Sequence, residues 1–393
     1  MSLQVFERSL RTTTVQLIQQ DLNVFNQASN GAMVLTTGDT MPDVITEIGF
    51  GLIDSLVSDR NQYAPIGNPA QIRVITELLA NRVNSAGKVG PVGISNGLLE
   101  KIMRNPAEVA ADVAAQASQA ILKRYVDVGI GAAYGAISSQ TGGNGKVNAV
   151  YTQTAPVAPM LPEGSFLPTY RDFERAATLF GDARSQIRAW FVSGVAYGQM
   201  LSDNVLANAD RLFQLGNIIV YRDVSGRVIV VTDSDPLINN NAVLGLTANG
   251  VVVEAGTVTT ATDTEILDEN IEYFWRQDFT YGVGVKGYMV TDALANAIRG
   301  KKSATLSDMT TAANWQLAGA GTTDQAPAST DGVVGEPNTD GRTGTGTGVR
   351  KRQTAPKAPS LTIKETAGVV LKLTGSVTSA PVAGGGSDAG SNA

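Results

Sequence analysis

The sequence predicts an α+β fold, and three observations support this prediction. Apolar residues recur at helical spacing through a long stretch that ends near residue 137. Two β-branched runs flank Ser225-Gly226, and two more flank Asn249-Gly250, which predicts two hairpins. The strands in the middle of the chain are therefore expected to pair largely antiparallel, without repeating strand–helix–strand units.

The clearest predicted element is a long helix within "NPAEVAADVAAQASQAILKRYVDVGIGAAYGAI". Asn105 is a suitable N-cap, Pro106 fits the first helical position, and Glu108 completes a capping-box pattern. One apolar stripe follows the helix at the expected spacing: Val109, Val113, Ala117, Ile121, Tyr125 and Val128. About 30 residues at 1.5 Å each give a length of roughly 45 Å. The alanines should allow another element to pack close along it.

The residues before this helix are predicted to form two less regular segments. Residues 1–40 are expected to be an extended arm with some helix, since Val15, Ile18, Leu22 and Phe25 follow helical spacing. Residues 41–95 are expected to be a long excursion, with "AQIRVITELL" and "KVGPVGI" as its two strands. A large surface loop is an equally good interpretation, and loops of this length usually have a function.

Several elements are predicted between the long helix and Trp315. A second helix is expected from Thr169, with Asp172 in capping-box position. "IRAWFVSGVAYGQML" should be a strand that runs into a helix, and "IEYFWRQDF" a half-buried strand. The stretch "TYGVGVKGYMVTD" alternates like a strand but contains three glycines, which indicates a bulge or a close backbone approach, as at a contact with another chain.

The composition excludes most catalytic chemistry. The 393 residues include no cysteine and no histidine, which removes thiol nucleophiles, the commonest metal ligand and the usual general base. The net charge is −6, so the chain is not expected to grip nucleic acid along its length. No signal peptide or membrane span is visible in the sequence, which predicts a soluble intracellular product.

Three motifs invite a functional interpretation that their context does not support. "GIGAAYG" resembles a dinucleotide fingerprint, but it closes a long helix and its spacing is wrong, so close helix packing and a loosening helix end are expected instead. "TDSDPLINNN" has too few carboxylates for a calcium loop and should be a turn after a strand. "GRTGTGTGVRKR" lacks the lysine–hydroxyl pair of a phosphate-binding loop and should be a basic island, with weak contact to nucleic acid as the alternative. No catalytic, cofactor-binding or metal-binding residue is predicted. Ser and Lys are plentiful enough to leave a Ser–Lys pair open, but no spacing favours one.

No aromatic residue follows Trp315, and the chain from about residue 321 is dominated by Gly, Ala, Pro, Ser and Thr. Such a composition cannot bury a core of its own. Within it, "SLTIKETAGVVLKLTGSVTS" predicts a β-hairpin. We expect this tail to be extended chain that becomes ordered on another surface, such as a neighbouring copy.

The order of these elements resembles that of tailed-bacteriophage major capsid proteins with the Hong Kong 97 fold. Four segments carry the resemblance, which covers about residues 15–318: "NVFNQASNGAMVL", "KVGPVGISNGLLEKI", "IRAWFVSGVAYGQML…LFQLGNIIVYRDVSGRVIVVTDSDPL" and "VGVKGYMV…LSDMTTAANW". They are pattern similarities and contain no catalytic signature.

The resemblance implies a division of the chain into five parts. These are an N-terminal arm (1–40), an extended loop over an adjacent subunit (41–95), a peripheral domain with a long spine helix (96–149 and 262–318), an axial domain (150–261) and a C-terminal extension (319–393). Some members of the fold cross-link a lysine to an asparagine. Lys88 is a loose candidate here, but no motif assigns that role.

The function implied by the resemblance is structural and not enzymatic. The chain would self-assemble as hexamers and pentamers into an icosahedral shell around double-stranded DNA, with only weak contact to the DNA and none to a membrane. Scaffold, portal and decoration proteins would be further partners, and the shell would assemble in the host cytoplasm. The alternatives are a bacterial nanocompartment shell of the same fold and a soluble enzyme that uses carboxylates and magnesium.

Overall fold

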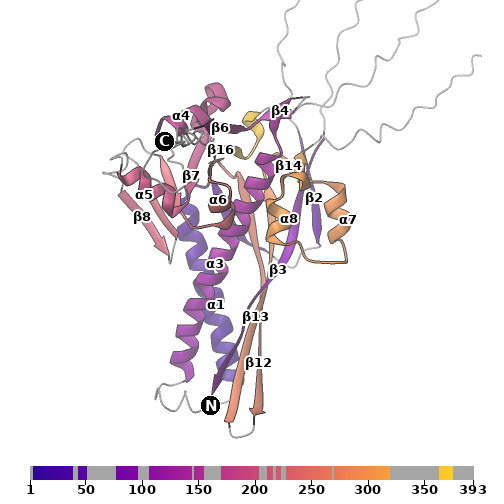
Figure 1. Ribbon diagram of the computed structural model, residues 1–393. Coiled ribbons are helices and arrows are strands. Elements are labelled where there is room, and N and C mark those ends of the chain that lie inside the picture. Colours follow the sequence, from indigo (N-terminus) through magenta and orange to yellow (C-terminus); the bar gives the residue numbers. More distant parts are fainter. Residues whose placement is uncertain are drawn as a thin grey trace, which may run out of the picture.

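The computed structural model describes residues 3–38, 43–50, 77–95, 106–143, 146–154, 170–202, 210–215, 218–222, 227–267, 270–318 and 363–374. These residues form a broad head on a narrow stalk (Figure 1). Helices and strands are both abundant, so the predicted α+β class is confirmed. No helix in the described part of the chain is both long enough and apolar enough to cross a membrane.

The long helix α3 (Pro106–Ser138) runs from the stalk into the head (Figure 1). It begins at Pro106 as predicted, whereas Asn105 lies outside the described residues. In the stalk only one side of α3 is buried, and Ala117 and Ile121 belong to that side. From Tyr125 onward nearly every side chain is buried, because the head surrounds the helix.

The N-terminal segment is mostly helix, so the prediction of an extended arm is wrong for residues 3–28. Helix α1 (Leu3–Ala28) packs along α3, with Ile18, Leu22 and Phe25 buried between them as their spacing predicted. The segment folds back on its own chain because it carries an apolar stripe that the small side chains of α3 can accept. It then continues into a strand.

A five-stranded sheet combines that strand with the excursion and a long hairpin. Its strands, in spatial order, are β1 (Met33–Thr37), β12 (Val251–Leu267), β13 (Asn270–Val285), β3 (Glu77–Ser95) and β2 (Val44–Phe50). Only β1 pairs parallel to its neighbour. The two strands predicted in the excursion are not partners: "KVGPVGI" and the described end of "AQIRVITELL" belong to the single strand β3, which pairs with β2 and β13.

A seven-stranded sheet forms much of the head. Its strands, in spatial order, are β6 (Val150–Thr154), β16 (Gly368–Thr374), β11 (Ala242–Thr247), β7 (Ile187–Val192), β10 (Val228–Val231), β9 (Ile218–Arg222) and β8 (Asp210–Leu215). The hairpin predicted around Ser225-Gly226 is confirmed, because β9 and β10 pair antiparallel. The strand predicted to run into a helix is also confirmed: β7 is followed by α5 (Gly194–Ser202).

The hairpin predicted at Asn249-Gly250 is wrong. The turn exists, and Asn249 has a φ of 53°, but β11 and β12 leave it into different sheets. The reason is the segment after α1: the amides of Asn249 and Gly250 donate hydrogen bonds to the carbonyls of Gly31 and Ala32. As a result β12 pairs with β1 and is directed away from β11.

Two further expectations need correction. The boundary proposed at residue 261 falls inside β12, which belongs to the five-stranded sheet along its whole length. The described part of the C-terminal tail forms one strand, β16, and no hairpin. This strand lies on its own chain, between β6 and β11, because those two strands leave room for a partner that is buried on both faces.

Shorter elements complete the head. They are β4 (Thr141–Gly143), β5 (Lys146–Asn148), α4 (Tyr170–Ala177), α6 (Asp235–Asn239), β14 (Tyr288–Val290), α7 (Asp292–Ile298), α8 (Leu306–Thr310) and β15 (Trp315–Leu317), with three 3₁₀ turns. The largest hydrophobic cluster surrounds the upper half of α3, and a second one lies on the other face of the seven-stranded sheet, under α4.

Candidate assembly surfaces

The stalk has only a small core of its own. Leu10 from α1, Ala114 and Ala117 from α3, and Trp275 from β13 form an apolar cluster there. These side chains join both helices to the long hairpin of β12 and β13 (Figure 1). Because few described side chains are buried in the stalk, apolar burial contributes little to its stability. Much of the surface of the stalk is available for contact with other molecules.

A buried polar layer separates this cluster from the main core. The side chain of Gln277 on β13 is fully buried, and its amide nitrogen donates to the hydroxyls of Thr14 (3.2 Å) and Thr260 (3.3 Å). Thr14 in turn donates to the carbonyl of Leu10 at 2.7 Å. The Oε1 atom of Gln277 is buried without a hydrogen-bond partner, so only the amide nitrogen is satisfied. Losing its bond to Thr14 would leave a further buried polar group unpaired, so this bond favours one register of α1 against the hairpin.

Both sheets end in strands that pair on one side only within the described part of the chain. These edge strands are β1 and β2 in the five-stranded sheet and β6 and β8 in the seven-stranded sheet. An edge strand presents unpaired backbone N–H and C=O groups, which can pair with another chain. The edges are therefore candidate contacts between copies.

Exposed large apolar side chains are scattered over several elements. They are Val24, Val92, Val195, Leu212 and Ile238. Val195 on α5 is the most exposed, at 64%, and Leu212 lies on the edge strand β8. Single exposed apolar residues are normal on protein surfaces. They lie on α1, β3, α5, β8 and α6 and form no single apolar patch in the described part of the chain.

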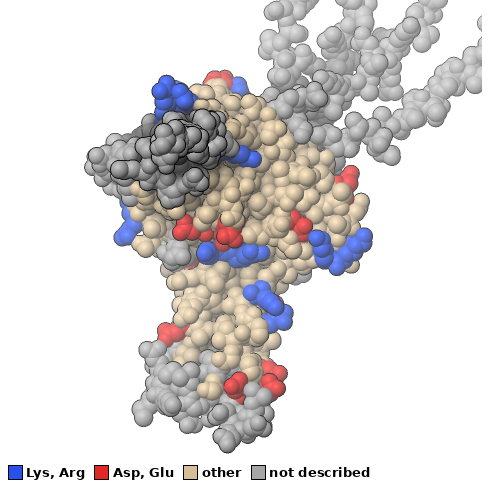
Figure 2. Space-filling model, in the orientation of Figure 1, with Lys and Arg blue, Asp and Glu red and all other residues tan. Residues whose placement is uncertain are grey.

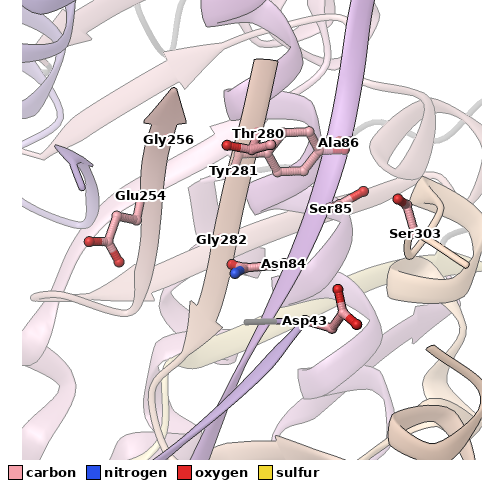
Figure 3. Close-up of a pocket in the computed structure, with 10 residues that line it drawn as sticks. All are labelled: Asp43, Asn84, Ser85, Ala86, Glu254, Gly256, Thr280, Tyr281, Gly282 and Ser303. Carbon is pink, nitrogen blue, oxygen red and sulfur yellow. The ribbon is translucent and has the colours of Figure 1, made fainter. Parts of the chain in front are cut away.

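A small pocket lies between the five-stranded sheet and the segment after α7 (Figure 3). Its lining comes from three neighbouring strands and two loops: Asp43, Asn84, Ser85, Ala86, Glu254, Gly256, Thr280, Tyr281, Gly282 and Ser303. Two carboxylates and several hydroxyls line it, so it is the first place to look for catalytic chemistry.

Three polar groups of this pocket, including both carboxylates, are engaged in holding the structure together. The Asp43 carboxylate accepts a hydrogen bond from the Gly300 amide at 2.8 Å, and the Glu254 carboxylate pairs with Arg82 at 2.7 Å. Ser85 donates its hydroxyl to the carbonyl of Ala304. The Asp43 and Ser85 contacts fasten the segment after α7 to the start of β2 and to β3, and the Arg82–Glu254 pair links β3 to β12. The pocket thereby fixes the base of the excursion that leaves along β2.

Asp127 is the carboxylate with the most unusual environment among the described residues. It lies on α3 where the helix meets the turn before α6, and burial raises its pKa to about 6. Ser234 and the cations of Lys123 and Arg124 lower the pKa and Asp235 raises it, but burial dominates. Its Oδ1 atom is buried without a hydrogen-bond partner, which leaves the charged form poorly solvated.

Charged side chains are scattered on the face shown in Figure 2, and most of that face is neutral. On the stalk, Arg276 and Asp278 form an exposed ion pair at 2.6 Å. Lys88, the candidate for a cross-link, is exposed on β3 and lies opposite Asp278 in the strand register. Among the described residues, no cluster of three or more Asp, Glu, His or Cys side chains could hold a metal ion.

The structure also places the motifs that the sequence singled out. "GIGAAYG" lies inside α3 and packs closely as expected: a Cβ on Gly135 would lie 2.3 Å from the Met309 carbonyl oxygen. The helix does not loosen there, since it continues to Ser138. "TDSDPLINNN" follows β10 as predicted, but it is not a simple turn, because Asp235–Asn239 form the short helix α6. "GRTGTGTGVRKR" lies outside the described residues.

The glycine-rich strand makes the predicted close approaches, but to its own chain. A Cβ on Gly284 would lie 3.0 Å from the Arg82 side chain, and one on Gly287 would lie 3.0 Å from the carbonyl oxygen of Glu365. Gly287 has a φ of 78°, a conformation that favours glycine. Its neighbour is the C-terminal segment. Nothing in the local sequence pattern could have identified that partner.

The chain was compared with known protein families. The model of the Gp13-like family, described as major capsid protein 13-like, matches residues 2–326. The chain belongs to this family of major capsid proteins. The match covers most of the chain, including all of the described elements except the 3₁₀ turn at 363–365 and β16.

Solved structures give a more distant likeness to this major capsid protein. A chain from Mycobacterium phage Adephagia is 12% identical, with a TM-score of 0.43, over 66% of this chain and 83% of that one. A cyanophage P-SCSP1u capsid chain is 13% identical, with a TM-score of 0.37, over 65% and 84%. A virus-like particle from Pyrococcus furiosus is 12% identical, with a TM-score of 0.35, over 71% and 94%. These similarities are too weak to support detailed comparison. No curated protein matches the chain.

Membership in the family gives the surfaces described above a common role. A major capsid protein associates with copies of itself to build a capsid shell, so surfaces open to other chains are the part of the molecule that matters for this role. The stalk and the sheet edges are the described features that best fit such contacts.

Proposed function

We propose that this chain forms hexamers and pentamers that close into an icosahedral shell around the double-stranded DNA of a tailed bacteriophage, with the Hong Kong 97 fold. The observation that carries the proposal is the match to a major capsid protein family over residues 2–326. A head with a narrow stalk agrees with it, since a stalk can reach past a neighbour in a shell (Figure 1).

The parts of the chain would then have distinct positions in the shell. The seven-stranded sheet would form the axial domain, and α3 with the five-stranded sheet would form the peripheral domain. The excursion that begins with β2 and returns along β3 would be the loop over an adjacent subunit. The boundary between the two domains would then lie between Thr247 and Val251, because the chain passes there from one sheet to the other.

The proposed role is structural and not catalytic. The carboxylates of the pocket in Figure 3 are held by the Gly300 amide and by Arg82, so neither is placed as a free base. Heterologous contacts that close by symmetry, repeated many times, would stabilise the shell by avidity. A net charge of −6 suits a wall that does not hold the packaged DNA tightly.

The remaining partners follow from the same proposal. Scaffold and portal proteins would direct assembly in the host cytoplasm, and decoration proteins would bind the finished shell. Electron microscopy of the purified protein under a range of salt and pH conditions tests the proposal. Closed particles with hexameric and pentameric units are expected, and a monomer under every condition would contradict it.

A further inference from the structure

The strand β16 fills a gap between two other strands of the seven-stranded sheet. It pairs parallel to β6, from Val370 opposite Val150 to Thr374 opposite Thr154. It pairs antiparallel to β11, from Gly368 opposite Leu246 to Lys372 opposite Ala242. Within the described residues β6 has no other partner in this sheet, so β16 alone joins β6 to β11.

Both faces of β16 are buried, in two different cores. Ala367 and Val370 belong to the cluster around α3, whereas Val369 and Leu371 belong to the cluster under α4. All four residues are fully buried. β16 therefore lies between two hydrophobic clusters and contributes side chains to each. Removing β16 would expose apolar side chains of both clusters to water.

The described chain before residue 319 and the described chain after residue 362 both meet Gly287. The amide of Ala318 donates to the carbonyl of Gly287 at 3.0 Å, and a Cβ on Gly287 would lie 3.0 Å from the carbonyl oxygen of Glu365. The chain therefore departs at residue 318 and returns at residue 365 beside the same glycine. The described contacts that hold the segment are its pairings with β6 and β11 and the packing of its side chains.

The fit in the gap is specific for one register. A Cβ on Gly368 would lie 1.9 Å from the carbonyl oxygen of Gly245, which is a backbone atom that cannot move aside easily. The Thr247 amide donates to the carbonyl of Ala367 at 2.8 Å, and the Val370 amide donates to that of Ala149 at 3.0 Å. Only a peptide with glycine at that position can pair in this way.

We propose that the gap between β6 and β11 is a docking groove for an extended apolar peptide, that residues 363–374 occupy it through their own contacts, and that the same segment from a second copy of the chain can replace them. Backbone pairing supplies affinity in such strand addition, and the buried side chains and the glycine supply specificity. This groove lies in a part of the molecule that is distinct from the stalk, and the proposal does not depend on shell assembly.

The test uses the full chain with a protease recognition sequence inserted between Gly335 and Glu336. The unassembled protein is cut, passed over a size-exclusion column under native conditions, and analysed by mass spectrometry. We expect the C-terminal fragment to elute with the rest of the chain. Release of the fragment, or unfolding of the cut protein, would overturn the proposal.

The second arm tests exchange. A labelled peptide of residues 360–376 is incubated with the cut protein, and the label bound to the body is measured by fluorescence anisotropy. The same peptide with Gly368→Ala should bind at least tenfold more weakly. A matched control is Gly198→Ala in the body, because a Cβ on Gly198 would meet nothing within 4 Å. Failure of the wild-type peptide to exchange, or equal binding of the Gly368→Ala peptide, would contradict the proposal.

Discussion

At the scale of single residues, glycines in α3 set how closely other elements approach it. Gly135 faces the backbone of α8, and its absent Cβ leaves room for the carbonyl oxygen of Met309. The Trp315 indole N–H donates to the same oxygen at 2.7 Å, which fixes that carbonyl in place. The backbone therefore cannot yield easily to an added methyl group.

We expect Gly135→Ala to destabilise the protein by about 1–3 kcal/mol through overpacking, despite the better helix propensity of alanine. Gly198→Ala in α5 is the control, since it adds a methyl group in open space, and should change stability by less than about 1 kcal/mol. Urea unfolding of both variants measures the difference. Equal stability of the two variants would show that α8 does not pack on Gly135 as described.

Asp127 makes stability depend on pH in a direction opposite to most acidic residues. Burial raises its pKa from the ordinary value of 3.8 to about 6 in the folded chain. The folded state therefore holds a proton that the unfolded state has released between about pH 4 and pH 6. Stability from this group is present at low pH and is lost as the pH rises through 6.

Asp127→Asn should therefore stabilise the protein above pH 6 and have little effect near pH 4. One unit of pKa shift corresponds to about 1.4 kcal/mol, so two units set an upper bound of about 3 kcal/mol, and partial exposure reduces this to about 1–2 kcal/mol. Urea unfolding at pH 4.5 and pH 8 measures it. Asp278→Asn, which removes an exposed ion pair, is the control and should stay within about 0.5 kcal/mol at both pH values. An Asp127→Asn effect that does not change with pH would contradict the assignment.

At the scale of elements, the sequence predicted those whose signal is local. The apolar stripe and Pro106 indicated α3, and the β-branched runs indicated the β9–β10 hairpin. The same local evidence failed at Asn249-Gly250, because a turn does not reveal which sheet each flanking strand enters. Its outcome depends on Gly31 and Ala32, more than two hundred residues earlier in the chain.

The tail shows the same limit more strongly. The stretch "SLTIKETAGVVLKLTGSVTS" predicted a hairpin, of which the structure describes one strand. The tail around it is dominated by Gly, Ala, Pro, Ser and Thr, and this composition suggested docking on a neighbouring copy. Its actual partners, β6 and β11, are distant in sequence, and their pairing depends on the fit at Gly368. The candidate assembly surfaces were equally hidden, because an edge strand is defined only once the sheet is known.

The position of β16 changes the effect expected from removing the tail. Three buried side chains, Val369, Val370 and Leu371, contribute about 1.5–3 kcal/mol each, which is comparable to the whole stability of many domains. A chain that ends at residue 362 should therefore be poorly soluble or unfold at a much lower temperature. A chain that ends at residue 376 keeps β16 and is the control. Circular dichroism melting of both decides it, and equal melting temperatures would contradict the placement of β16.

The excursion can be shortened in a way that separates folding from assembly. Deleting all of 41–95 would remove β3, which pairs with β13 and buries Val83 in the main core, so that deletion should harm the fold itself. Phe50 and Glu77, however, are direct partners in the strand register. Replacing residues 51–76 by Asn-Gly should close β2 and β3 as a two-residue hairpin and leave the monomer folded.

We expect this shortened chain to melt within a few degrees of the full chain but to lose shell assembly, because the part proposed to reach an adjacent subunit is gone. Sedimentation velocity under assembly conditions measures the loss. A variant with 51–76 intact and an added Gly-Ser after residue 376 controls for manipulation of the chain. If the shortened chain forms shells of normal size, residues 51–76 are not needed for the assembly contacts and the prediction is wrong.

At the scale of the whole molecule, the described features that can bind another chain lie on the surface and not in a pocket. The pocket with several polar groups is occupied in fastening one loop to a sheet, while the stalk and the sheet edges present backbone and side chains to the surroundings. The family match assigns the chain to capsid shells, where such surfaces meet copies of the same chain.

Electron microscopy of the purified full-length chain, beside the chain with 51–76 replaced by Asn-Gly, tests this account most directly. The account predicts closed particles with five- and six-fold units for the full chain and only unassembled subunits for the shortened one. Discrete monomers of the full chain under every condition, or identical particles from both chains, would contradict it.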